Sequence, residues 1–248
     1  MELIKTTGVV IRRTQVKDND LILTLFTKDI GVIKASARGA RGFKNRLAAG
    51  TALFAYSEFV LYPGREMYKV NGCELIESFY SLTTNIERLA FATYIADLTG
   101  YTVQEEADTE RLLSLFLNTF YLFARWGGEL RIVKCVFELK LLEYLGLAPC
   151  LFECMACGEE NALHHLSPGA GGLLCMECCR HETDSRPLSE ACLEALRHVY
   201  TSDDKKAFAF RLPQAALEEL EGHVAAFLSE YIDHDFYSLD YLNTILGK

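Results

Sequence analysis

The sequence contains no hydrophobic run that approaches the roughly 20 residues that a transmembrane helix requires. Its first ten residues also lack the apolar core of a secretory signal peptide. The chain has nine cysteines. Disulfides persist mainly in oxidising compartments. Because the chain has no targeting segment, we expect it in a reducing compartment, with its cysteines present as free thiols or metal ligands. These absences predict a cytoplasmic protein with no membrane partner.

Catalytic motifs are absent as well. The chain has no G-x-x-x-x-G-K-[ST] phosphate loop, no H-E-x-x-H and no G-x-S-x-G. Asp18 and Asp20 resemble half of a metal-carboxylate site, but a polar turn explains them better. We therefore expect no catalytic residues, and a binding protein rather than an enzyme.

Acidic residues are missing between Asp29 and Glu58, in a chain whose net charge is −9. Residues 1–80 carry a net charge of +4 and residues 81–248 one of −13. The acid-free stretch contains five cations, and an aromatic residue, Phe43, lies among them. The cations are Lys34, Arg38, Arg41, Lys44 and Arg46. Lysine and arginine contact phosphates, and a phenyl ring can stack on a base. We predict that these six residues bind nucleic acid, the alternative being a solvated surface loop.

The first third of the chain has the pattern of short β-strands. Alternating or β-branched runs separated by turn signals predict strands at residues 3–12, 21–26, 32–37, 54–62 and 68–76. Five short strands without a long helix are typical of a small closed barrel, and the OB-fold is its five-stranded form. We expect an OB-fold nucleic-acid-binding domain at residues 1–80.

From residue 84 onward the apolar residues recur at helical spacing. Helices are predicted from residue 84, at 109–123 and 130–145, from 189 to 199 and at about 214–231. The expected fold class is therefore α+β: an OB-fold barrel followed by a helical domain at residues 81–248, with a cysteine module inserted at about 150–185.

Two cysteine pairs, Cys154-x-x-Cys157 and Cys175-x-x-Cys178, have zinc-ribbon or treble-clef spacing. Four thiolates form a closed tetrahedral shell without an open position for water, so we expect one structural Zn²⁺ rather than a catalytic one. Two alternatives, disulfide bonds and a redox-active C-x-x-C motif, explain two matched cysteine pairs in a chain without a signal peptide less well. Cys179 could replace Cys178 as the fourth ligand, and Cys150 is a further spare thiol. We expect surface or packing roles for His164, His165 and His181.

Several segments together resemble one family, the RecO proteins of bacterial DNA repair. The resemblance spans nearly the whole chain and rests on the order of these segments together with the two cysteine pairs: Gly8-Val-Val-Ile-Arg12, Asp20-Leu-Ile-Leu-Thr-Leu-Phe-Thr-Lys28 with Gly31, Ala37-Arg-Gly-Ala-Arg41, Phe137-Glu-Leu-Lys-Leu-Leu-Glu-Tyr-Leu-Gly-Leu-Ala-Pro149 and Ser238-Leu-Asp-Tyr-Leu242. One departure is Asn45, where a serine is common in the family. Some members lack the cysteines, so zinc is not essential to the family's activity.

The resemblance implies a recombination mediator without chemistry of its own. Such a protein binds single- and double-stranded DNA and anneals complementary strands. It acts with RecR and with the C-terminal tail of single-strand-binding protein (SSB), helps RecA to load onto coated strands, and is associated with the nucleoid. The competing interpretation is a general RNA- or tRNA-binding OB-fold protein.

The C-terminal tail of SSB is acidic and ends in apolar residues. Such a tail needs an apolar pocket between helices with a cation at the mouth of the pocket. The acidic helical part is better suited to hold a protein than DNA. Its candidate cations, near Trp126 and Phe137, are Arg125, Arg131, Lys134 and Lys140. The alternative for each of them is ordinary surface charge.

Overall fold

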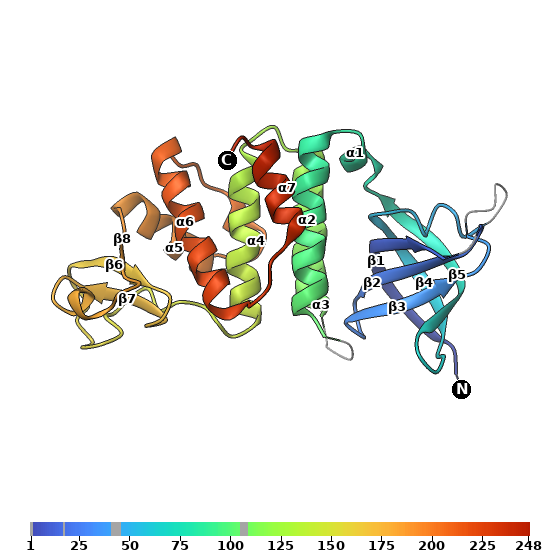
Figure 1. The fold of residues 1–248 in the computed structure, drawn as a ribbon, viewed down its shortest axis with the longest axis horizontal. Coiled ribbons are helices and arrows are strands. Elements are labelled where there is room, and N and C mark those ends of the chain that lie inside the picture. Colours follow the sequence, from blue (N-terminus) through green and yellow to red (C-terminus); the bar gives the residue numbers. More distant parts are fainter. Residues whose placement is uncertain (1, 17, 41–45, 105–108) are drawn as a thin grey trace. The chain divides into compact units, whose positions relative to one another are not determined.

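The computed structural model describes the 248-residue chain apart from residues 1, 17, 41–45 and 105–108 (Figure 1). The chain forms two compact units, one of Met1–Trp126 with Phe236–Lys248 and one of Gly127–Asp235. The first contains the predicted barrel and three of the helices that follow it, and the second contains the cysteine module.

The barrel consists of five strands, β1 (Ile4–Gln15), β2 (Leu21–Thr27), β3 (Val32–Ala37), β4 (Ala55–Tyr62) and β5 (Tyr68–Ser78). They close in the order β1-β2-β3-β5-β4. Every neighbouring pair is antiparallel except β3 and β5, which are parallel. A closed five-stranded barrel is the predicted OB-like architecture, so the expected fold class is confirmed.

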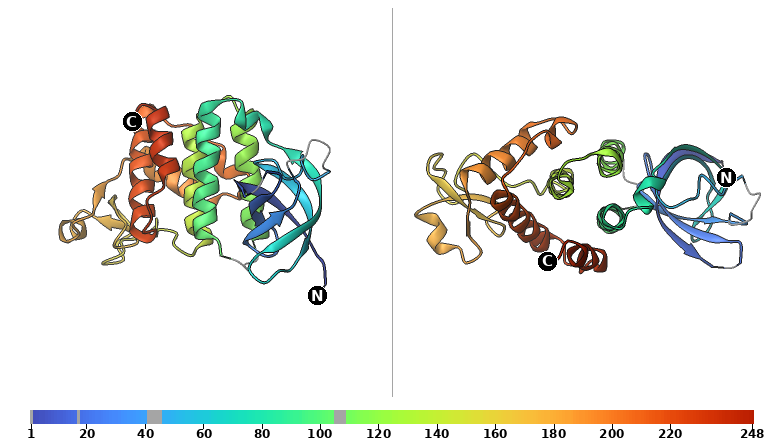
Figure 2. Two further views of the ribbon diagram at one scale, coloured as in Figure 1. Left: turned by 45° about the vertical axis from the view of Figure 1, so that its right-hand side comes forward. Right: turned by 90° about the horizontal axis from the view of Figure 1, so that it is seen from above.

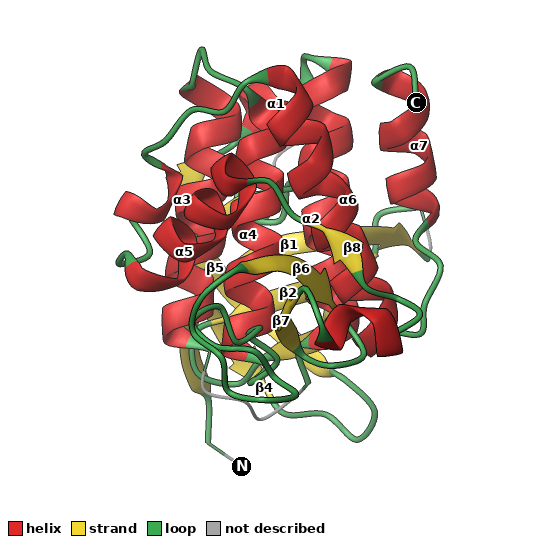
Figure 3. Ribbon diagram, turned by 90° about the vertical axis from the view of Figure 1, so that its left-hand side faces the viewer, coloured by secondary structure: helices red, strands yellow, loops and turns green. Residues whose placement is uncertain are grey.

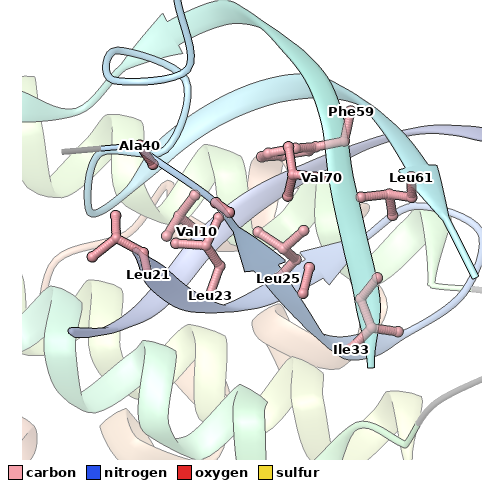
Figure 4. Close-up of a cluster of buried hydrophobic side chains, with 11 residues drawn as sticks. Val10, Leu21, Leu23, Leu25, Ile33, Ala40, Phe59, Leu61 and Val70 are labelled. Atoms are coloured by element: carbon pink, nitrogen blue, oxygen red, sulfur yellow. The ribbon is translucent and has the colours of Figure 1, made fainter. Parts of the chain in front are cut away.

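Alternation along the strands fills the barrel. Leu21, Leu23 and Leu25 of β2 point inward and meet Val10, Phe59 and Leu61 in one buried cluster (Figure 4). β1 passes so close to β2 that a Cβ on Gly8 would lie 2.7 Å from the carbonyl oxygen of Phe26. Glycine at this position therefore permits the strand contact that closes the barrel.

Helices of the same unit cover one side of the barrel. β5 leads through the short α1 (Tyr80–Thr83) into α2 (Ile86–Thr102), and α3 (Glu110–Arg125) follows (Figure 1). Asn85 caps α2, because its side chain accepts a 2.9 Å hydrogen bond from the amide of Arg88. Buried rings join α3 to the barrel through Phe26 of β2, paired with Phe116, and Phe54 just before β4, paired with Phe120. Their ring centroids lie 5.4 and 5.1 Å apart. This side of the barrel is therefore not available to a ligand.

A fourth helix of the unit, α7 (Tyr237–Ile245), packs against α2 and was not predicted. It has nine residues, and Leu242 is the only one of them that is fully buried. So short a helix with so narrow an apolar face gives little periodicity from which to predict it.

Thr109 ties the start of α3 to the hairpin of β2 and β3. Its buried hydroxyl donates to the carbonyl oxygen of Thr27, and lies 3.2 Å from that of Lys28. Thr109→Val removes the hydroxyl donor of the Thr27 carbonyl, although the amide of residue 109 still donates to the Lys28 carbonyl at 3.1 Å. We therefore expect the free energy of unfolding to fall by about 1–3 kcal/mol. Urea unfolding measures the loss, and the exposed Thr14→Val of β1 is the matched control. Equal effects of the two substitutions would contradict this role.

The second unit combines three helices with a small sheet. The helices are α4 (Leu130–Tyr144), α5 (Glu190–Thr201) and α6 (Gln214–Tyr231). The antiparallel sheet has the order β7-β6-β8, formed by β6 (Leu163–Ser167), β7 (Gly172–Cys175) and β8 (Arg186–Pro187) (Figure 3). Two 3₁₀ turns complete the unit, η1 (Cys178–His181) and η2 (Lys206–Phe208).

Local signals account for the helix ends of this unit. Ser189 caps α5 and accepts a 3.3 Å hydrogen bond from the amide of Cys192. Gly146 follows α4 with a φ of +77°, and Pro213 precedes α6. The chain between α4 and α5 forms the small sheet and its loops, beside α5 and α6 (Figure 2).

Candidate metal centre and nucleic-acid interface

The structure brings Cys154, Cys157, Cys175 and Cys178 together. Their Sγ atoms all lie within 4.8 Å of one another, and those of Cys157 and Cys175 are 3.8 Å apart. A Zn–S bond of about 2.3 Å gives a tetrahedron whose S–S edges are about 3.8 Å. The cluster could therefore bind a metal ion in the predicted four-thiolate geometry.

The backbone around the first pair forms a tight knuckle. The amide of Gly158 donates to the carbonyl oxygen of Cys154 at 2.8 Å, and Gly158 has a φ of +76°, a conformation that favours glycine. The amide of Met155 donates to Leu173 of β7 at 2.9 Å. This bond holds the first pair beside the strand that ends at Cys175, so the sheet positions both halves of the site.

Amide groups point at the sulfurs and stabilise negative charge on them. Burial by itself raises the pKa of the Cys154 thiol, but hydrogen bonds from the amides of Cys175, Ala156 and Cys157 lower it to about 6. The pKa of Cys178 is raised instead, first by its hydrogen bond to Cys175 and then by that to Cys157. Backbone amides of Cys178 and Glu177 also lower the pKa of Cys175. The pocket thus favours thiolates at two of its four sulfurs and resists further negative charge unless a cation is present. A divalent, thiophilic metal ion fits this donor set.

The neighbouring candidates lie outside the cluster. Cys179 Sγ donates to the carbonyl oxygen of Met176 at 3.4 Å, so the geometry selects Cys178 as the fourth sulfur. The half-buried Cys150 pairs through its backbone with Gly172. His164 and His181 are exposed and His165 is half-buried, as expected for surface or packing residues.

His223 of α6 connects that helix to β8 in the second unit. It is buried, its Nε2 lies 3.1 Å from the carbonyl oxygen of Pro187, and Glu219 Oε1 lies 3.8 Å away. Burial lowers the pKa of His223, although the Pro187 carbonyl and Glu219 oppose the shift and Arg186 adds to it.

Because the pKa of His223 is lower in the folded state, the unfolded state binds the extra proton first as the pH falls. We expect the free energy of unfolding to decrease below pH about 6.5, by at most about 1.4 kcal/mol per pH unit from this group. Urea unfolding at pH 7.5 and 5.5 should give a smaller difference for His223→Gln than for the wild type. The exposed His234→Gln is the control. An unaltered difference in His223→Gln would contradict the assignment.

The predicted nucleic-acid residues are only partly described. Lys34, Arg38 and Arg46 are exposed, whereas Arg41, Phe43 and Lys44 lie outside the described residues. Strand register adds further cations to the same outer surface. Arg12 pairs with Thr24, which pairs with Lys34, and Ser36 pairs with Lys69. We call Arg12, Lys34, Arg38 and Lys69 the basic face.

Two carboxylates of the barrel strands face each other rather than the basic face, although Asp20 Oδ1 accepts a 2.8 Å hydrogen bond from the amide of Gly39, beside Arg38. Glu58 of β4 and Glu74 of β5 are exposed and pair with each other across the strands. Within the described chain, no ion pair joins a carboxylate to Lys34, Arg38 or Lys69. These cations are therefore available to an anionic ligand.

Sequence reasoning missed part of this surface. A cavity of about 270 Å³ opens on the outside of β3, β4 and β5, and its lining residues are Ser36, Arg38, Tyr62, Lys69, Val70 and Asn71. Lys69 lies on β5, outside the acid-free stretch, so a search for charge runs does not find it. Tyr62 lies on the outer face of β4, as the burial pattern of that strand shows, but the pairing of β3 with β5 is needed to assemble the cavity.

For three of the predicted partner-binding cations, the alternative of ordinary surface charge was wrong, because Arg131, Lys134 and Lys140 are buried. Arg131 of α4 forms a two-pronged ion pair with Glu221 of α6, with Nε 3.1 Å from Oε1. Lys134 pairs with Glu138 at 2.9 Å, and the buried Lys140 pairs with Glu143 at 2.8 Å. Of the four candidates only Arg125 is exposed, and its guanidinium lies 4.7 Å from the ring centroid of Tyr121.

Among the described residues, no helix is both long and apolar enough to cross a membrane.

Comparisons with known proteins agree along nearly the whole chain. The family model "Recombination protein O N terminal" matches residues 1–79, and "Recombination protein O C terminal" matches residues 83–240. A "DNA repair protein RecO" of Acetivibrio thermocellus is 36% identical over 248 residues, which cover 99% of this chain and 98% of that protein. Proteins of the same name from Alkaliphilus metalliredigens and Thermoanaerobacter sp. are 33% and 30% identical, covering 96% and 99% of this chain and 98% and 99% of theirs.

Proposed function

The chain belongs to the RecO family of DNA repair proteins, and from this premise we propose that it is a DNA-binding recombination mediator with no catalytic chemistry of its own. It binds single- and double-stranded DNA and anneals complementary strands. Together with RecR it helps RecA to load onto strands coated by SSB. We place it in the cytoplasm, associated with the nucleoid. The observation that carries this proposal is the basic face on the outside of an OB-like barrel.

Electrostatics supports the proposal. Cations without carboxylate partners bind phosphates by releasing condensed counterions, and this contribution does not depend on sequence. The helices cover one side of the barrel, so a strand of DNA would use the outer surface of β1, β2, β3 and β5. A mediator that anneals arbitrary sequences needs binding of this kind.

The cysteine cluster has a supporting role in the proposal. Cys154, Cys157, Cys175 and Cys178 hold one structural Zn²⁺, which stabilises a segment with few buried side chains of its own. Four protein ligands leave no position for a substrate, so the metal contributes to folding and not to a reaction.

We also propose that the helical domain begins near residue 80. In this proposal the helical domain binds the protein partners. Arg131, Lys134 and Lys140 are already engaged in ion pairs with Glu221, Glu138 and Glu143. The exposed Arg125, beside Tyr121, is then the cation at which the tail of SSB would dock. Arg125→Ala in the full chain should weaken binding of a labelled tail peptide, whereas Arg180→Ala, at an exposed site of the cysteine module, should not.

An annealing assay tests the proposed function. Complementary oligonucleotides are coated with SSB, and duplex formation is followed with and without the full chain. We expect the protein to accelerate annealing at substoichiometric or stoichiometric amounts relative to the DNA. We also expect it to bind single-stranded DNA more tightly than RNA of the same length. No acceleration, together with a preference for RNA, would overturn the proposal in favour of an RNA-binding protein.

A further inference from the structure

The cavity on the barrel has polar groups whose placement is set by strand pairing. Ser36 of β3 lies opposite Lys69 of β5 in the parallel ladder. Lys69 in turn lies opposite Tyr62 of β4 in the antiparallel ladder. Side chains opposite one another across neighbouring strands have Cβ atoms roughly 5 Å apart. The three side chains therefore form one row, and Arg38, two residues beyond Ser36, extends it.

Two backbone features shape the edge of the cavity. The pairing of β4 with β5 shifts between Val60 and Leu61, so that Asn71 has no partner in the ladder. Such a bulge re-aims a side chain, and bulges are over-represented beside binding sites. The turn between β4 and β5 needs glycine at position 64, where a Cβ would lie 2.2 Å from the carbonyl oxygen of Met67.

The chemistry of the lining matches the parts of one nucleotide. Arg38 and Lys69 are cations suited to a phosphate. Tyr62, whose exposed fraction is 40%, offers a ring on which a base can stack. Asn71 carries donors and an acceptor for a base edge or a sugar, and the Ser36 hydroxyl, which donates to the carbonyl oxygen of Tyr68 at 3.4 Å, adds an acceptor. None of the six lining residues is a carboxylate, so nothing in the lining repels a phosphate.

The size of the cavity restricts the ligand further. Its volume of about 270 Å³ is just below the roughly 300 Å³ at which small-ligand pockets begin. One base with its phosphate is of this scale, whereas a base pair is not. In a duplex the bases are paired and stacked, so they cannot reach Tyr62.

We propose that this cavity takes one unpaired nucleotide of a DNA strand, with the base on Tyr62 and its phosphate between Arg38 and Lys69. This inference rests on the proposed function and deepens it. The basic face as a whole binds any phosphate chain, and the cavity adds a preference for single strands. A mediator of annealing benefits from this difference, because the preference disappears when the strand becomes duplex.

Tyr62→Ala in the full-length protein tests the inference. Loss of one stacked base costs about 1–3 kcal/mol, so affinity for oligo-dT should fall about 5- to 150-fold. Affinity for a duplex of the same length should not change, and neither should the slope of log K against log salt, because no phosphate contact is lost. Tyr62→Phe keeps the ring and should bind like the wild type. Tyr80→Ala, at a tyrosine that is 70% exposed on α1, is the matched control. Thermal melting confirms that each variant is folded.

The outcomes separate the inference from the proposed function. Unchanged affinity of Tyr62→Ala for oligo-dT, or an equal loss on single strands and duplex, overturns the cavity assignment and leaves the basic face intact. A wild-type protein that binds no DNA overturns the proposed function itself. Oligo-rU and free dTMP are two further ligands whose affinities are measured in the same experiment. Tighter binding of either one than of oligo-dT, lost in Tyr62→Ala, overturns the assignment to a DNA strand.

Discussion

Cys154→Ser is expected to lose the bound metal and to unfold the segment between α4 and α5. Cys154 is 2% exposed, and its Sγ accepts a hydrogen bond from the amide of Cys175 at 3.4 Å. In small zinc modules the apparent free energy of metal binding is about 10–16 kcal/mol, and much of it is folding free energy. Removing one of four ligands should therefore destabilise the module more than any ordinary core substitution.

Metal analysis and thermal unfolding measure this effect. The wild type, purified without chelator, should contain about one zinc per chain, and Cys154→Ser close to none. Cys179→Ser and Cys73→Ser are the controls, because Cys179 bonds to the carbonyl of Met176 and Cys73 lies in the barrel. Both controls should keep the metal and most of the stability. A wild type without zinc, or equal losses in Cys154→Ser and Cys73→Ser, would contradict the metal site.

The second large effect is expected on DNA affinity. Replacing Lys34, Arg38 and Lys69 together by glutamine removes three candidate phosphate contacts without reversing any charge. Each lost contact lowers the salt slope by about 0.7 on single strands and 0.9 on duplex. Three contacts correspond to about a 100-fold loss of affinity for single strands at 0.1 M salt. The loss should appear with every sequence tested.

A control variant removes the same number of positive charges from the second unit instead of the barrel. Lys205, Lys206 and Arg211 are exposed in the second unit, and replacing them by glutamine should leave the salt slope unchanged. A third variant, Arg41, Lys44 and Arg46 to glutamine, measures the share of the predicted loop. If the Lys34, Arg38 and Lys69 variant kept the wild-type slope, its cations would be merely solvated and the basic face would not be a DNA surface.

Local sequence patterns were sufficient to predict several features of the structure. Alternation and turn residues placed the five strands within a few residues of those observed, because each strand has one buried face. The two cysteine pairs could be assigned for a similar reason. A C-x-x-C segment forms its own turn, and the question left open was only whether Cys178 or Cys179 supplies the fourth sulfur.

Features that depend on distant pairing were not predictable. The cavity needs Ser36 beside Lys69 and Lys69 beside Tyr62, and the pairing of β3 with β5 brings together residues far apart in the sequence. Arg131 looked like a surface cation because its partner, Glu221, lies 90 residues away on α6. Ordinary surface charge was the alternative for each cation of α4, yet most residues of this helix are buried.

Photo-cross-linking of single-stranded DNA to the full-length protein, followed by peptide mass spectrometry, tests most directly whether the barrel is the DNA-binding surface. We predict cross-links in residues 34–46 and 62–71, the segments that carry the cavity and all of the basic face except Arg12. These cross-links should be lost when Lys34, Arg38 and Lys69 are replaced together. Cross-links confined to residues 127–235, or unchanged in that variant, would contradict the assignment of DNA binding to the barrel.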